Sequence, residues 1–249
     1  MKLPSHRTLV AALAVSGVLF VSACGASGGS DASSTTAKPA DKTTTTKATT
    51  TTTEADADAQ ARADSVDITL SEFPDGWTAA PASTDDSDSP MKKCDPTFSD
   101  DSAKLAKHRT DEFSVGAAES LDLTQFSAET VVFEDADAAD AAVEVFNDPE
   151  VISCLDSSLK DTLGSDGTTI EGSLSEDDLD PGTDNSAGVS GTFTLTSTDG
   201  TTAKITVAIL AMSTNDVGTM VTILTMDQGF DPTTLQDPIT TLAKLQGEA

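Results

Sequence analysis

Basic residues, histidine and tyrosine are scarce in this chain of 249 residues. It has 14 lysines and arginines against 42 acidic residues, which gives a formal net charge of -28. Such a surface repels nucleic acid and anionic phospholipid headgroups, and no basic stripe is present to overcome that repulsion. The composition therefore excludes nucleic-acid binding, and the acidity by itself has no catalytic meaning.

The scarcity of histidine limits the chemistry further. Once an N-terminal signal is removed, only His108 remains, in a charged stretch without a nucleophile motif. A Ser-His-Asp or Cys-His arrangement needs a histidine base, and zinc sites need clustered ligands. Phosphate-binding glycine motifs are missing as well. We therefore predict that His108 is a surface residue and that the protein has no catalytic residue of these classes, no metal site and no cofactor.

Carboxylates are the one catalytic resource that the chain has in excess. A pair of acids is enough for a wall-directed hydrolase, which stays open as an alternative function. Runs of acids are usually solvated surface, which is the simpler interpretation. The run at 176–184 also suggests weak calcium binding, although its spacing does not fit the EF-hand pattern. The acid-rich segments are 85–88, 134–140 and 176–184.

The N-terminal hydrophobic run is too short for a permanent membrane span. It extends from Leu9 to Phe20, whereas a spanning helix needs roughly 20 apolar residues. It follows a basic start that contains Lys2 and Arg7. This combination is typical of a secretory signal, so residues 1–23 are predicted to be a signal peptide.

The signal ends in a motif that resembles the lipobox of bacterial lipoproteins. A branched apolar residue, two small residues and a cysteine stand together as Val21-Ser22-Ala23-Cys24. The resemblance implies cleavage before Cys24 and a diacylglyceryl group on its thiol, which would hold the chain at the outer face of the cell membrane. Two acyl chains, at about 0.8 kcal/mol per buried CH2, give a firm anchor. The alternative is an ordinary signal followed by an incidental cysteine.

Large apolar side chains are missing between Gly25 and Asp64. Such a segment cannot bury enough apolar surface to offset the entropy lost on ordering. Residues 24–64 are therefore predicted to be a disordered tether with a length of roughly 35 Å. Nine threonines between Thr43 and Thr53 also raise the hypothesis of O-glycosylation.

Residues 65–249 regain apolar periodicity and are long enough for one domain with a core. Two cysteines fall here, Cys94 and Cys154, and outside the cytoplasm such a pair is typical of a disulfide. Two free thiols or a metal site are the alternatives. We predict the disulfide, which would join the helix carrying Cys154 to the loop containing Cys94.

Secondary structure is clearest in the middle and at the end of the domain. The middle predicts a strand at 130–133, an alanine-rich helix at 135–146, and a second helix that starts at Asp148-Pro149 and ends at Gly164. The end predicts strands at 191–198, 203–212 and 218–226, a turn at Asp199-Gly200, and helix starts at Asp231-Pro232 and Asp237-Pro238. This segregated order predicts an α+β fold with an antiparallel sheet packed by helices.

Four features carry a resemblance to a known family. They are the segment Leu70–Trp77, the later Cys94, the strand ending at Phe133 before an alanine-rich helix, and Cys154 on the next helix. In these the domain resembles secreted actinobacterial lipoproteins and, more loosely, the sensor domains of PknH-like mycobacterial receptor kinases and LpqN-type lipoproteins. The resemblance implies a sheet packed by helices around a cleft that binds a ligand or partner. The kinase domain has two disulfides, whereas this one has cysteines for one.

The only tryptophan, Trp77, is the single candidate for ligand binding. Beside a Phe-Pro-Asp-Gly turn such a residue usually fills the core, and lining a pocket is the alternative. Our leading hypothesis is a non-enzymatic, membrane-anchored, sensor-like domain that binds an envelope protein or a small amphiphilic ligand. A hydrolase with paired carboxylates and a purely structural or accessory envelope lipoprotein are the other interpretations.

Overall fold

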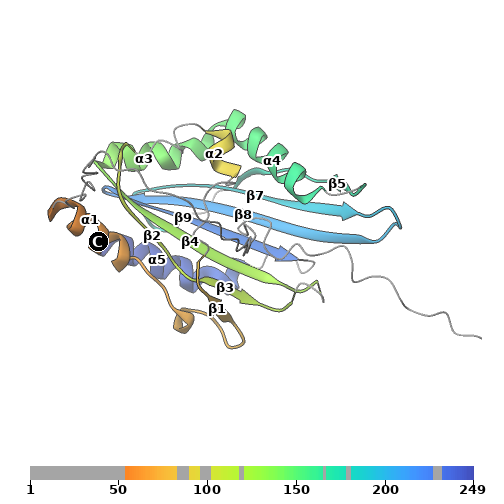
Figure 1. Cartoon of the computed structure of the whole chain (residues 1–249), viewed down its shortest axis with the longest axis horizontal. Coiled ribbons are helices and arrows are strands. Elements are labelled where there is room, and N and C mark those ends of the chain that lie inside the picture. The colour runs from red at the N-terminus through yellow and green to blue at the C-terminus, as the bar shows by residue number, and fades with distance from the viewer. Residues whose placement is uncertain are drawn as a thin grey trace, which may run out of the picture.

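An antiparallel β-sheet runs through the whole domain (Figure 1). The structure is a computed structural model that describes residues 54–82, 90–95, 102–117, 121–164, 167–177, 181–226 and 232–249. The predicted signal peptide, Cys24 and most of the predicted tether lie outside the described residues. Among the helices that are described, none has the length and apolar character that crossing a membrane requires.

Nine strands form the sheet within these residues, and each pairs with its neighbours in antiparallel fashion. The order is β1-β3-β4-β9-β8-β7-β5, while β2 also pairs with β4 and β6 also pairs with β7. The predicted α+β fold is thus confirmed. The strands are β1 (Thr78–Ala80), β2 (Lys104–Arg109), β3 (Glu112–Val115), β4 (Thr124–Phe133), β5 (Thr169–Glu171), β6 (Ser175–Asp177), β7 (Asn185–Thr196), β8 (Thr202–Thr214) and β9 (Val217–Met226).

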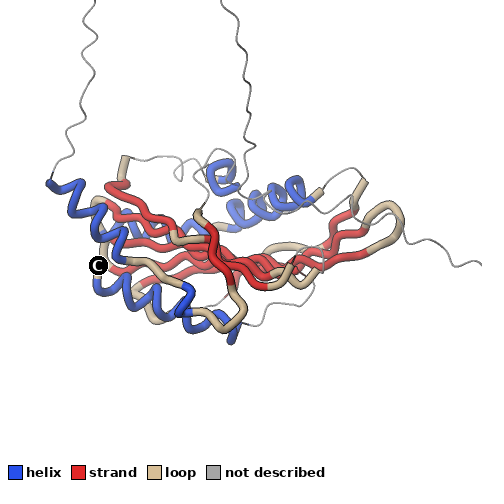
Figure 2. The backbone as a smooth tube through the Cα atoms, turned by 60° about the horizontal axis from the view of Figure 1, so that its bottom comes forward, coloured by secondary structure: helices blue, strands red, loops and turns tan. Residues whose placement is uncertain are grey.

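The central strands β8 and β9 are apolar on both faces, as their sequences predict for strands inside a sheet. On the first face, Val207 and Ile209 belong to a core that includes Phe146. On the second face, Leu210 and Met212 belong to a separate core that includes Phe126. The sheet therefore separates two hydrophobic cores, and each core is covered by its own helices (Figures 1 and 2).

Helices α3 (Ala136–Glu144) and α4 (Pro149–Leu163) cover the first face, joined by the short turn η4 (Val145–Asn147). The Asp135 carboxylate accepts a hydrogen bond from the Ala138 N–H at 2.9 Å and so caps α3. The Asp148 carboxylate accepts one from the Glu150 N–H at 2.8 Å and caps α4. These aspartates satisfy N–H groups that have no partner inside a helix, which confirms both predicted helix starts.

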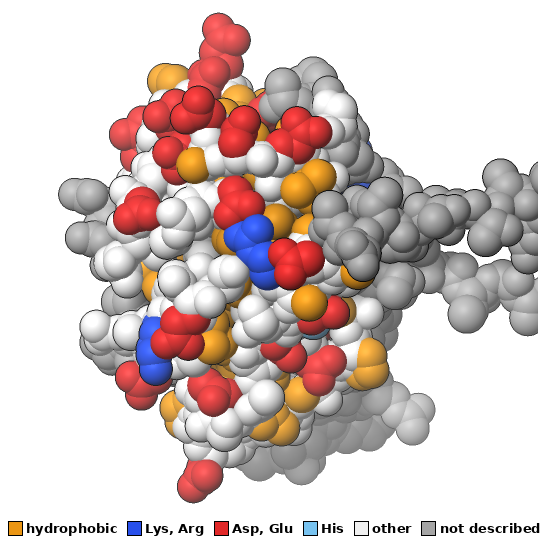
Figure 3. All heavy atoms as spheres, turned by 90° about the vertical axis from the view of Figure 1, so that its left-hand side faces the viewer, with side chains coloured by type: hydrophobic (Ala, Val, Ile, Leu, Met, Phe, Trp, Pro, Cys, Tyr) orange, Lys and Arg blue, Asp and Glu red, His pale blue; other side chains and the backbone are white. Residues whose placement is uncertain are grey.

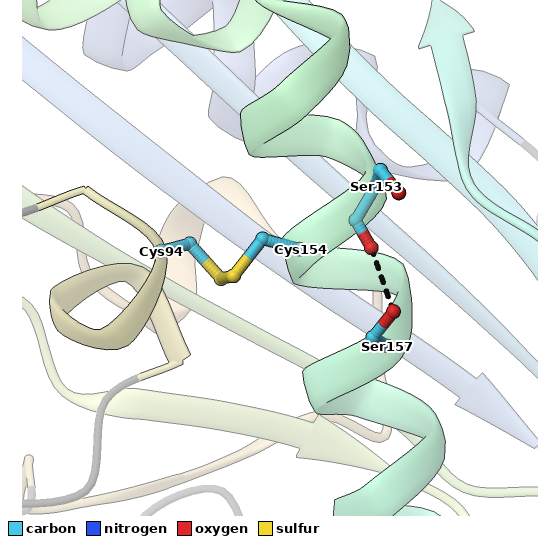
Figure 4. The surroundings of a disulfide bond; sticks show 4 residues. All are labelled: Cys94, Ser153, Cys154 and Ser157. Carbon is cyan, nitrogen blue, oxygen red and sulfur yellow. Dashed lines mark hydrogen bonds between the residues drawn. A yellow bond between two sulfur atoms is a disulfide. The ribbon is translucent and has the colours of Figure 1, made fainter.

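Helix α2 (Pro90–Cys94) lies beside α4, and a disulfide joins Cys94 to Cys154 (Figure 4). The Cα atoms of the two cysteines are 5.4 Å apart. Cys94 therefore ends a short helix, where we expected a loop. Among the α2 side chains that the structure describes, 91–94, Met91 is the one in the buried first-face core, and Cys94 is partly buried against it. The covalent bond therefore adds to a small packing contact between α2 and the domain.

Helices α1 (Glu54–Ser65) and α5 (Gln236–Glu248), with the turn η5 (Pro232–Leu235) before α5, cover part of the second face (Figure 2). The prediction that the tether extends to Asp64 is therefore wrong, because residues 54–64 are helical. Ala59 and Ala63 are buried in the second-face core. Alanine has the highest helix propensity, and its small methyl lets a helix approach the sheet closely, so this segment packs without any large apolar side chain.

Arg62 fixes α1 to the far end of the chain. Its guanidinium donates hydrogen bonds to both carboxylate oxygens of Asp216, which lies in the turn between β8 and β9, and one of these contacts measures 2.9 Å. Its Nε donates to the backbone oxygen of Ala249 at 2.8 Å. Both charged side chains are about three-quarters buried. The hydrogen bonds from Arg62 lower the pKa of the Asp216 carboxyl.

We expect this ion pair to stabilise the fold at neutral pH and not in acid. A carboxylate with a lowered pKa in the folded state loses its contribution as the pH falls through that lowered value. Asp216→Asn should lower the free energy of unfolding by about 1.5 kcal/mol at pH 7, and the difference should shrink below about pH 4. Urea unfolding at several pH values measures this.

The control for this prediction is Glu248→Gln. Glu248 pairs with Lys244 at 3.8 Å, and both side chains are mostly exposed, so little change is expected. A constant difference between Asp216→Asn and the native chain from pH 7 to pH 2 would contradict the assigned role of the charge.

Candidate functional site

Four aromatic rings meet at one edge of the second face, and Trp77 is the most exposed of them. Phe73 stacks on Phe113 with ring centroids 4.4 Å apart and meets Phe126 edge-on at 5.3 Å. The indole of Trp77 lies 4.7 Å from the ring of Phe73. The three phenylalanines are buried, whereas Trp77 is half-buried. Trp77 is therefore held by a buried aromatic support and keeps part of its surface exposed, which differs from the expected core residue.

A short capped turn places these rings. The turn η1 (Leu70–Glu72) starts with a capping box, in which the Thr69 N–H donates to the Glu72 carboxylate at 2.8 Å. Phe73 ends this turn, and Gly76 then adopts a φ of +99°, a conformation that favours glycine. The chain reverses at Gly76 and brings Trp77 to the start of β1. The segment that carries the family resemblance is thus the segment that builds the aromatic support.

A row of threonines crosses the second face from the position of Trp77. The register of the sheet pairs Thr124 of β4 with Thr225 of β9, Thr225 with Thr206 of β8, and Thr206 with Thr192 of β7. Residues paired in this way point to the same face of a sheet. We call Thr124, Thr225, Thr206 and Thr192 the threonine row.

Trp77 stands at the end of this row. Thr124 pairs with Val115 of β3, and the neighbouring Ser114 pairs with Thr78 of β1. Continuing this register by one residue places Trp77 opposite Val115. A Cβ on the preceding Gly76 would be 4.0 Å from a methyl of Val115, which agrees with this placement. The aromatic support and the threonine row therefore form one continuous line across the second face.

The hydroxyls of the row differ in their partners. The Thr192 and Thr206 hydroxyl oxygens are 2.9 Å apart and share a hydrogen bond. Thr192 is exposed, and Thr124 and Thr206 are half-buried. Thr225 is only 3% exposed, and within the described part of the chain its hydroxyl has no hydrogen-bond partner. A buried hydroxyl without a partner is costly, so Thr225 calls for an explanation.

The described helices that cover the second face, α1 and α5, end near the threonine row. Figure 2 shows α1 and α5 over one half of the sheet, with no described helix on this side over the half that ends in the β7–β8 hairpin. The side chains that continue this half are polar and at least partly exposed: Thr194, Thr196, Thr202 and Lys204. The described part of the second face is thus an apolar half under helices and a polar half beyond them.

The other residues singled out in the sequence do not join this surface. His108 lies on β2 between two carboxylates, with Nδ1 3.2 Å from Asp64 Oδ1 and Nε2 3.3 Å from Asp67 Oδ1. Its side chain is 23% exposed, so it is half-buried rather than the surface residue that we expected. It connects the end of α1 and the following segment to β2.

Two carboxylates of the acidic segment at 134–140 have structural roles, whereas the segment at 85–88 lies outside the described residues. Asp135 caps α3, and the Asp140 carboxylate accepts a hydrogen bond from the buried Ser213 hydroxyl at 2.6 Å. In the run at 176–184, residues 178–180 lie outside the described residues. Figure 3 looks onto one end of the molecule and shows acidic side chains gathered along the upper edge of this face, with others scattered below. No group of three potential metal ligands occurs among the residues that the structure describes.

The threonine row is the feature that the sequence did not reveal. Its one local signal is the alternation of threonines with apolar residues in β7, which predicts a strand: Thr192, Phe193, Thr194, Leu195 and Thr196. That alternation does show that the threonines share a face. It does not show that the same face continues through other strands, because this depends on pairing between residues far apart in the chain.

Comparison with known proteins gives a loose structural likeness only. No family model matches the chain, and no curated protein sequence matches it. Among solved structures, it is similar to the extracellular domain of PknH from Mycobacterium tuberculosis, with 12% identity, 75% of this chain and 96% of that chain covered, and a TM-score of 0.37. It is also similar to LpqN, involved in cell envelope biogenesis of the same organism, with 13% identity, coverage of 71% and 78%, and a TM-score of 0.32. Both kinds of protein named from the sequence resemblance are thus found, at scores too low to transfer a site or a function.

Proposed function

We propose that this chain is a lipoprotein of the bacterial cell envelope whose domain binds a ligand or protein partner without catalysing a reaction. In this proposal lipid on Cys24, including palmitate, holds the protein at the outer face of the cell membrane. The basic start, the short apolar run and the Val21–Cys24 motif support the anchor. The proposed partners are the membrane, reached through this lipid, and an envelope protein or small amphiphilic ligand.

The position of Trp77 supports the binding role most directly. Ligand sites combine apolar and aromatic surface with a few well-placed polar groups. Trp77 provides a supported, half-exposed ring, and the threonine row provides hydroxyls on the same line. Leu70, which precedes this aromatic segment, is 43% exposed and adds apolar surface to the short turn before Phe73. These features together make the Trp77 edge of the second face the best candidate for a binding surface.

Trp77 also provides the measurement. The chain has one tryptophan and no tyrosine, so its fluorescence reports on this single position. We expect saturable quenching or a spectral shift when the mature chain is titrated with envelope lipids or soluble wall fragments, which have no tryptophan of their own. Calorimetry with the responding probe should then show binding by Trp77→Ala that is at least about tenfold weaker, as for a central aromatic contact.

Leu105→Ala is the control, because Leu105 is a large apolar residue that is 43% exposed and lies on β2. It should bind like the native chain. Equal affinity of Trp77→Ala and Leu105→Ala would contradict the binding role of Trp77. Chemical analysis of the probe after incubation should show it unchanged, and steady release of sugar or fatty acid would contradict the non-catalytic part of the proposal.

A further inference from the structure

The imidazole of His108 on β2 faces two carboxylates, one at the end of α1 and one in the segment that follows. Nδ1 lies 3.2 Å from Asp64 Oδ1, and Nε2 lies 3.3 Å from Asp67 Oδ1. Nε2 is buried and has no other hydrogen-bond partner within the described part of the chain. Each ring nitrogen therefore has a carboxylate as its polar neighbour.

The protonated ring fits this arrangement at both nitrogens, and the neutral ring does not. A neutral imidazole carries one N–H, so its other nitrogen turns a lone pair towards a carboxylate, whereas the imidazolium donates from both nitrogens. Histidine ordinarily changes its charge between about pH 5 and pH 8, and carboxylates remain ionised down to about pH 4. The favourable combination of charges therefore occurs in mildly acidic surroundings.

The other described groups on β2 and β4 leave these two carboxylates as the charges that face the ring. His108 pairs with Thr130 of β4, which is neutral and buried. Its neighbours Lys107 and Arg109 point to the opposite face of the strand, where Arg109 pairs with Glu129. A change in the charge of the ring is therefore felt mainly by α1 and the segment after it.

Helix α1 depends on such polar contacts because its buried side chains in the second-face core, Ala59 and Ala63, are small. Its other charged contact is insensitive to pH in this range. The hydrogen bond to Asp216 raises the pKa of Arg62, with a smaller contribution from Asp58, and the same bond lowers the pKa of Asp216. Both partners are therefore ionised in mildly acidic and in mildly alkaline solution, so this pair does not change where the histidine does.

We propose that His108, Asp64 and Asp67 form a pH-sensitive clamp, which holds α1 against β2 when His108 is protonated and loosens when His108 loses its proton. The predicted tether leads directly into α1. With the proposed anchor, the clamp decides whether these 12 residues belong to the domain or lengthen the tether. The clamp itself rests on the geometry around His108 and not on the identity of any ligand.

Hydrogen exchange of residues 54–65 in the full mature chain, followed by mass spectrometry, tests the clamp. Native and variant chains are compared at the same pH, so the intrinsic exchange rates cancel. We expect His108→Gln to speed the exchange of this segment about fivefold at about pH 5.5, because one charged contact is lost. At about pH 8.5, where histidine is ordinarily neutral, the change should be less than about twofold. Asp161→Asn is the control, because it removes an exposed carboxylate from α4, and it should change neither rate.

The double variant Asp64→Asn/Asp67→Asn gives an independent readout. Its amides can donate to a neutral ring, so we expect the effect of adding His108→Gln to be the same at both pH values. A pH-dependent effect that survives in this double variant would overturn the clamp. Equal effects of His108→Gln alone at the two pH values, or no effect at either, would overturn it as well. The response of Trp77 to the probes is measured separately, so failure of the clamp and failure of the proposed function are distinguishable.

Discussion

Replacing both domain cysteines by serine is expected to lower the free energy of unfolding by about 4 kcal/mol. The two cysteines are 60 residues apart, so the disulfide closes a long loop. In the chain-entropy model, a loop of this length restricts the unfolded chain strongly, and its loss gives the unfolded state more freedom. The effect on α2 adds to this, because Met91 is the one buried core side chain among the described α2 side chains, 91–94.

Urea or guanidinium unfolding of Cys94→Ser/Cys154→Ser beside the native chain measures this loss. The native chain unfolded in a strong reductant should approach the double variant. Ser157→Ala is the matched control on α4, because its hydroxyl donates only to the Ser153 carbonyl in the same helix (Figure 4). Its expected change is within about 0.5 kcal/mol. A loss of less than 1 kcal/mol for the double variant would contradict a stabilising role of the disulfide.

The disulfide is on the first face and Trp77 is on the second, which separates stability from binding. Under conditions where the double variant remains folded, its Trp77 emission should match that of the native chain. A changed emission spectrum would show that the two faces are coupled through the sheet, which the separate cores do not suggest.

Local signals in the sequence were sufficient for the central part of the fold. The caps at Asp135 and Asp148, the alternation in β7 and the turn at Gly200 depend on residues close together in the chain. In these regions the predicted and observed elements agree within a few residues, although β7 begins at Asn185, six residues before the predicted start. Local hydrogen bonding and hydrophobic periodicity determine such elements directly.

The beginning of the domain could not be predicted in the same way. Strand β2 (Lys104–Arg109) is short and half of its residues are lysine or arginine, and it forms because β4 provides a partner for its backbone. Helix α1 has no large apolar residue, and it is held by buried alanines and by Arg62. Composition alone assigned this helix to the tether. Its stability comes from contacts with segments much later in the chain, which no local pattern reveals.

The candidate site depends even more on contacts between residues far apart in the chain, so less of it could be predicted from the sequence. Trp77 stood out in the sequence because it is unique, but its half-exposed position depends on Phe113 and Phe126, which come from two other strands. The threonine row combines residues from β4, β7, β8 and β9, and only the pairing register brings them into one line. A single residue type was therefore predictable, and the surface around it was not.

The proposed lipid anchor is supported by the sequence alone. Loss of the lipidated cysteine should abolish lipid labelling completely. Cys24→Ala removes the only thiol that the lipobox-like motif offers for acylation. Without two acyl chains the domain has no hydrophobic attachment of comparable strength in the proposed mature protein. We therefore expect complete loss of lipid label, whereas Cys94→Ser, the matched control, should keep it.

Metabolic labelling with palmitate, followed by cell fractionation and mass measurement of the N-terminus, tests the proposed lipid anchor. We expect the native chain to carry the label, to start at Cys24 and to be found in the membrane fraction. Cys24→Ala should carry no label and should leave the membrane fraction once its signal is removed. Label on Cys24→Ala, or a native chain that is unlabelled and released into the medium, would show that Cys24 does not anchor the protein.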